Sequence, residues 1–171
     1  KAMESQVIYD MALAIASFVF IFLFMLIQTG SIWITSWGIF SILSSFNIAN
    51  FIYRVVFDYK YFGVFHILAI FIILGIGSDN IFVFMDTWKE HGRNHQNSDL
   101  VTRLSMVFKS AAKATFITSL TTTIAFLSNI QSPLLAVSSF GLFSAILVAV
   151  NYCSCTLFLP TVIIFHEQRR K

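Results

Sequence analysis

One carboxyl group stands out in this sequence because of where it lies. Asp79 is followed by Asn80 inside an apolar run that begins near Tyr61 and has no Lys, Arg, Asp or Glu before Asp79. A carboxylate near the middle of a bilayer costs about 2.5–3.5 kcal/mol on insertion scales. It must be protonated, paired with a cation or hydrated in a polar cavity, and each state can couple a proton or sodium ion to movement. Asp79 and Asn80 are therefore the candidate cation-coupling residues, and a protonated structural acid between helices is the alternative.

The residues near Asp79 and in two later apolar runs predict a polar seam. Gly75 and Gly77 precede Asp79, and small residues let membrane helices pack closely. Six hydroxyl residues fall within positions 115–123, too many for a surface that faces lipid. We expect Asp79, this hydroxyl cluster and Asn151 to meet between three helices. The expected seam residues are Ser78, Thr118, Ser119, Thr121, Thr122 and Asn151.

Other chemistries have little support in the sequence. His66 is alone in an apolar run and is predicted to be a core residue. His91 and His95 are four residues apart, but the polar, glycine-containing segment around them does not favour a helical metal pair. We find no nucleophile–base pair, phosphate-binding loop or pair of catalytic carboxylates. We therefore expect no catalytic residue, no metal site and no cofactor, and the chain is not expected to be an enzyme.

The composition places these residues in a membrane protein. Of 171 residues, 57% are apolar and only 11% are charged, whereas soluble domains have about 25% charged residues. Five apolar runs each reach the roughly 20 residues that a spanning helix needs. The expected fold is an all-α polytopic membrane protein with five transmembrane helices, at about 7–27, 32–57, 61–87, 111–130 and 134–165.

The hydrophilic segment between the third and fourth runs contains a predicted amphipathic helix over residues 98–110. Ser98 is a suitable N-cap, and apolar residues follow at helical spacing on one face. The helix either lies in the membrane interface or leads directly into the fourth span. We favour the interface, because the basic residues of this segment suit anionic headgroups.

The distribution of basic residues predicts the orientation. Eight Lys and Arg residues lie in the segment 89–113 and at the C-terminus, against three on the opposite side. The positive-inside rule then places the C-terminus in the cytoplasm and the N-terminus outside. We expect the chain to be part of a longer protein, since such a start implies an earlier span. The basic residues lie in breaks between apolar runs, so nucleic acid is not an expected partner.

The segment that contains Asp79 resembles a known family. Gly75–Val83 is similar to the G-x-G-x-D-D-x-F-V pattern of Dispatched- and Patched-type proteins in the resistance-nodulation-division (RND) superfamily. Thr118–Phe126 resembles the family's T-S-x-T-x-x-x-A-F stretch, and Leu159–Glu167 resembles the L-P-A-V-x-x-x-H-E end of Dispatched. The resemblance implies that residues 1–171 are a sterol-sensing domain, spans two to six of one transmembrane half. It also implies extracellular domains and a second transmembrane half as partners.

The resemblance further implies a function. Such proteins are thought to couple proton or sodium flux to movement of sterols, lipids or lipid-modified proteins, with the acidic pair as the coupling site. Asp79 matches the first acid, whereas Asn80 replaces the second and cannot titrate, although its amide oxygen could bind a cation. The alternative is a sterol-sensing or scaffold domain that binds lipid without moving it. The expected location is the plasma membrane, including that of cilia, or an endomembrane.

Overall fold

The computed structural model describes residues 2–56, 64–94 and 100–170, and all regular structure in these ranges is helical. Five α-helices follow in order, with a 3-10 turn, η1, between the last two. They are α1 (Ala2–Thr29), α2 (Ile32–Val55), α3 (Val64–Asn94), α4 (Leu100–Ser128), η1 (Asn129–Gln131) and α5 (Leu135–Arg170). The expected all-α class is therefore confirmed.

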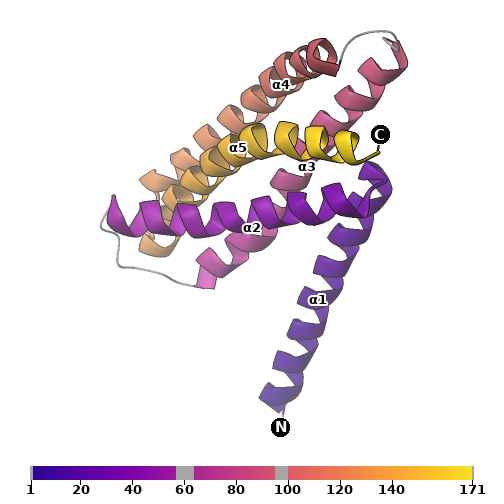
Figure 1. Ribbon diagram of the computed structural model, residues 1–171. Helices are drawn as coiled ribbons and strands as arrows, with labels where there is room; N and C mark the ends of the chain where they lie inside the picture. Colours follow the sequence, from indigo (N-terminus) through magenta and orange to yellow (C-terminus); the bar gives the residue numbers. More distant parts are fainter. Residues whose placement is uncertain (1, 57–63, 95–99, 171) are drawn as a thin grey trace.

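Helices α2 to α5 form a bundle, and α1 diverges from it. α5 packs against α2, α3 and α4, and it is therefore the helix around which the bundle is built. Figure 1 shows α1 leaving the bundle at an angle, so that only its end near α2 lies against other helices. The bundle core contains side chains that are at most 1% exposed, among them Ile42, Tyr53, Ile73, Phe84, Phe143 and Leu147.

Three helices contain segments that are long and apolar enough to cross a membrane, among the residues that the structure describes. These segments are Ile32–Val55, Leu68–His91 and Leu135–Phe165, and α1 contributes a shorter apolar segment, Ile15–Thr29. The expected span at 111–130 is helical but does not reach the same hydropathy, because its hydroxyl residues offset its apolar ones. α5 has 36 residues and is about 54 Å long, so it extends beyond a hydrocarbon core of about 30 Å.

The prediction of a separate amphipathic helix over residues 98–110 is wrong. Leu100 to Ser128 form one continuous helix, the second of the two arrangements considered, while positions 98 and 99 lie outside the described residues. No Gly or Pro interrupts this stretch, so nothing in the sequence ends the helix early. Val107, Ala111 and Thr115 form a single buried stripe across the expected boundary, and packing of that stripe favours one continuous helix.

The turn between α1 and α2 joins three helices at one end of the bundle. Gly30 has a φ of 69°, and its N–H donates to the Leu26 carbonyl at 2.9 Å, which is a left-handed helix cap. The buried hydroxyls of Thr29 and Thr35 are 2.7 Å apart and hold the two helices together. Lys89 on α3 donates to the backbone carbonyl of Gln28, so the end of α3 meets the same corner.

Candidate functional site

A cavity of about 160 Å³ lies between α3 and α4, and Asp79 lines it. Ile76, Asn80 and Val83 contribute the rest of the α3 wall at intervals of three and four residues, which places them on one helix face. The α4 wall consists of Thr118, Ser119 and Thr122. Asp79 itself is exposed, so this side of the cavity opens to the surface of the chain. The structure thus brings five of the predicted polar residues together.

The threonine hydroxyls of the cavity are held by their own helix. Thr118 Oγ1 donates to the Thr115 carbonyl at 3.0 Å, and Thr122 Oγ1 donates to the Thr118 carbonyl at 2.8 Å. This back-bonding uses the proton of each hydroxyl, which leaves the oxygen lone pairs as acceptors. The α4 wall can therefore accept hydrogen bonds or contact a cation without losing its internal bonds.

Two buried polar atoms of the cavity residues have no hydrogen-bond partner in the structure. These are the Asn80 amide nitrogen, on a residue 3% exposed, and the Ser119 hydroxyl oxygen, on a residue 4% exposed. A buried donor or acceptor without a partner costs about 1–3 kcal/mol. A polar guest beside both atoms would recover part of this free energy. The site is chemically suited to a water molecule or to a hydrated or oxygen-coordinated cation.

The remaining predicted seam residues do not line this cavity. Ser78 is buried, and its hydroxyl donates to the Leu74 carbonyl of its own helix. Thr121 is exposed and donates to the Ile117 carbonyl at 3.1 Å. Asn151 is fully buried on α5, where its amide oxygen accepts a 3.8 Å hydrogen bond from the Cys155 thiol. The expected meeting of Asp79 with Asn151 is therefore not found.

The two predicted packing glycines have different surroundings. A Cβ added to Gly77 would lie 2.7 Å from Cγ1 of Ile42 and 3.2 Å from the amide oxygen of Asn151, so α2 and α5 approach closely there. A Cβ added to Gly75 would meet nothing within 4 Å. Gly77 is thus a packing residue and Gly75 is not. Positions two apart on a helix point about 200° from each other, which also explains why Asp79 and Gly77 meet different helices.

Sequence reasoning missed the apolar part of the cavity, but it predicted His66 correctly as a core residue, while His95 lies outside the described residues. Ile76 and Val83 could have been identified, because they lie three and four residues from Asp79. His66 is fully buried, and its ring centroid lies 5.4 Å from that of Tyr53 and 4.9 Å from that of Phe143. His91 Nδ1 is 3.0 Å from the Thr87 carbonyl. Among the described residues, no group of three or more His, Cys, Asp or Glu side chains could hold a metal ion.

Comparison of the sequence with known proteins identifies the family of this chain. The family described as "Sterol-sensing domain of SREBP cleavage-activation" matches residues 14–171. Protein dispatched homolog 1 of Mus musculus is 35% identical over 157 residues, covering 92% of this chain and 10% of that protein. Protein dispatched homolog 3 of Gallus gallus is 38% identical over 155 residues, covering 90% and 11% respectively.

Similarity also extends to insects. Protein dispatched of Drosophila melanogaster is 30% identical over 164 residues, covering 83% of this chain and 14% of that protein. The chain thus spans between a tenth and a seventh of the length of these relatives. Its apolar helices and these matches make it a multi-pass integral membrane protein. The chain belongs to the sterol-sensing domain family and is a Dispatched-type member of the RND superfamily.

Proposed function

We propose that this chain is part of a transporter that moves sterol, lipid or lipid-modified protein, and that Asp79 couples this movement to a proton or sodium ion. The observation that carries the proposal is the cavity between α3 and α4. Asp79, Thr118 and Thr122 line it together with Asn80 and Ser119, and each of the last two residues has a buried polar atom without a hydrogen-bond partner. The matched family supports the lipid part of the proposal.

The chemistry of the cavity suits a single small cation. Asp79 supplies the one charged group among the lining residues, and Thr118, Ser119 and Thr122 supply hydroxyl oxygens. Asn80 adds a neutral amide beside the carboxyl group. Oxygen ligands of this kind suit a hard cation, and the carboxyl group alone suits a proton. Charge at this site would change by one unit when the ion binds.

Coupling requires the ion to bind two conformations with different affinity. α3 and α4 form opposite walls of the cavity, so any change in their spacing changes how many hydroxyl oxygens reach the Asp79 carboxylate. An ion that binds the closer arrangement more tightly shifts the population toward it. We further propose that the N-terminus lies on the outer, non-cytoplasmic side of the membrane and the C-terminus in the cytoplasm. A second transmembrane half and extracellular domains would complete the transporter.

The test is transport by the intact protein in liposomes with an imposed sodium or proton gradient. Asp79→Asn preserves the size of the side chain but removes its charge and its proton, so gradient-driven release of cargo should be lost. Thr121→Val serves as the control, because Thr121 is a hydroxyl residue of the same α4 cluster that does not line the cavity. Unchanged transport by Asp79→Asn, with normal insertion of both variants, would reject the coupling role.

One observation favours a second candidate, a sterol- or lipid-sensing domain that does not transport. The position after Asp79 holds Asn80, so this cavity has one titratable group and not two. Under this alternative, lipid binding would remain in the liposome experiment, but no imposed gradient would change the distribution of the cargo. The same measurement on the unmodified protein therefore separates the two functions.

A further inference from the structure

A small cavity lies in the core of the bundle, where α2, α3 and α5 meet. Ile81 contributes its α3 wall, and Ser41 on α2 and Cys155 on α5 contribute polar atoms to it. We call it the core cavity. Its volume is about 10 Å³. A volume of about 10–15 Å³ is enough for one water molecule, so any guest of the core cavity must be of that size.

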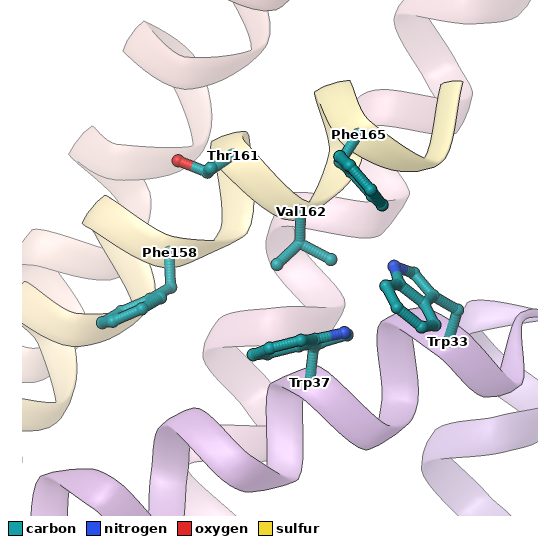
Figure 2. Close-up of a pocket in the computed structure, with 6 residues that line it drawn as sticks. All are labelled: Trp33, Trp37, Phe158, Thr161, Val162 and Phe165. Carbon is teal, nitrogen blue, oxygen red and sulfur yellow. The ribbon is translucent and has the colours of Figure 1, made fainter. Parts of the chain in front are cut away.

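Three apolar side chains separate the core cavity from a larger cavity between α2 and α5. Trp37, Phe158 and Val162 line both of them. Figure 2 shows the larger cavity, which has a volume of about 350 Å³, with Val162 of α5 pointing toward Trp37 of α2. Trp37 and Phe158 are 40% and 48% exposed, whereas Ser41 and Cys155 are 6% and 2% exposed. The apolar wall therefore shields the two polar residues of the core cavity from the surroundings of the bundle.

The hydroxyl of Ser41 indicates a polar guest in the core cavity. A serine inside a helix can donate to the carbonyl four residues earlier, and Ser45, one turn further along α2, donates in this way to the Ser41 carbonyl at 2.9 Å. Ser41 Oγ does not follow this pattern, because it is buried and has no hydrogen-bond partner among the described residues. Cavities that stay empty in proteins are apolar, and a water molecule is the common partner of a buried polar group that has no other. The core cavity has both the space and the unpartnered hydroxyl that a water molecule requires.

Cys155 offers a second contact to the same guest. Its thiol donates to the Asn151 amide oxygen at 3.8 Å, so its proton is used and the sulfur lone pairs remain as weak acceptors. None of the described residues that line the core cavity is charged. A cation would lose its hydration there without gaining a counter-charge, whereas a neutral water molecule can both accept from Ser41 and donate to Cys155.

We propose that the core cavity binds one ordered water molecule, which accepts a hydrogen bond from the Ser41 hydroxyl and donates one to the Cys155 sulfur. The water links α2 to α5, and the chain of hydrogen bonds continues through Cys155 to Asn151. The Asn151 amide oxygen lies 3.2 Å from the position of a Cβ added to Gly77, so the chain ends against α3. Gly77 and Asp79 point about 200° from each other, which places this chain on the side of α3 away from the Asp79 cavity. The proposal does not depend on ion coupling at Asp79.

The test is X-ray hydroxyl-radical footprinting of the intact protein in lipid nanodiscs. X-rays split water, and a radical formed from a bound water molecule oxidises the side chain beside it. Cys155 should therefore be oxidised although it is buried, and a soluble radical scavenger should not protect it, because the scavenger intercepts radicals from bulk water. In Ser41→Ala the water loses its donor, so the oxidation rate of Cys155 should fall about tenfold, corresponding to about 1.4 kcal/mol of binding free energy. Ser45→Ala is the matched control, because Ser45 is buried on the same helix, donates to its own helix and does not line the core cavity.

A second pair of variants covers the case in which Ser41→Ala does not insert normally. Ser41→Val places methyl groups in the core cavity and should also lower the oxidation rate of Cys155, with Ser45→Val as its control. The proposal would be overturned if Cys155 of the unmodified protein were oxidised no faster than background. It would also be overturned if the scavenger suppressed the oxidation, since bulk water would then be its source. The same conclusion would follow if an inserted Ser41 variant were oxidised at the unmodified rate, or if a Ser45 variant lost as much oxidation as its Ser41 counterpart.

Discussion

Gly75 and Gly77 offer a sharp test of the packing around the candidate site. Alanine at either position adds one methyl group and the same gain in helix propensity, about 0.8–1.0 kcal/mol. At Gly77 the new Cβ would lie 2.7 Å and 2.8 Å from Cγ1 and Cδ1 of Ile42, which is fully buried. At Gly75 it would contact nothing within 4 Å. The difference between the two variants therefore isolates the steric effect.

The expected size of that effect follows from overpacking. Adding a methyl group where the neighbours cannot move costs about 1–3 kcal/mol. Ile42 has no exposed surface into which it can turn, and the Asn151 amide oxygen would lie 3.2 Å from the new atom. Gly77→Ala should therefore be less stable than Gly75→Ala by about 1–3 kcal/mol.

The buried thiol of Cys155 provides the measurement. Cys155 is 2% exposed on α5 and shares a small pocket with residues of α2 and α3, so a thiol reagent reaches it only after the packing of α5 against these helices opens. A loss of about 1–3 kcal/mol should raise its labelling rate about 5- to 150-fold. The exposed Cys153 is replaced by Ser in all samples, so that the labelling measured in this segment comes from Cys155 alone. Equal labelling rates for the two alanine variants would refute the reasoning.

Three further substitutions test other parts of the fold and site. Gly141→Ala should strongly destabilise the α4–α5 hairpin, by about 3 kcal/mol in denaturant unfolding, because its Cβ would lie 2.7 Å from the Phe126 carbonyl and from Asn129 Cβ. Gly30→Ala should lower stability by about 1–2 kcal/mol, since its φ is 69°, and Gly30→Asn should lose less in the same assay. Ser119→Ala should keep or raise thermal stability, because it removes a buried hydroxyl that has no partner, while reducing gradient-driven transport; loss of stability without loss of transport would contradict its place in the ion site.

The candidate site was partly predictable from the sequence. An acid in an apolar run and a hydroxyl cluster in a later run both avoid lipid, so a meeting of Asp79 with Thr118, Ser119 and Thr122 was expected and is found. Asn151 was expected there for the same reason, but it lies beside Gly77 on another side of α3. Avoidance of lipid indicates that a polar residue faces protein without indicating which helix it faces.

The cavity of about 350 Å³ between α2 and α5 was not predicted, although its signal is present in the sequence. Trp33 and Trp37 are four residues apart, and Phe158, Val162 and Phe165 follow at intervals of four and three. Each set forms a stripe on one helix face, but the many other phenylalanines give similar stripes. Only the packing of α2 against α5 brings these two stripes together.

The amino-acid sequence by itself determined the helical class, the apolar runs and the position of Asp79 deep within one of them. These properties depend on composition and on periodicity over a few turns, which act locally. Tertiary structure decided that residues 100–110 are part of α4, that Gly77 and not Gly75 meets α2, and that Asp79 and Ser119 line the same cavity. The rotation of each helix is fixed by contacts between side chains far apart in the sequence, and no local pattern specifies such contacts.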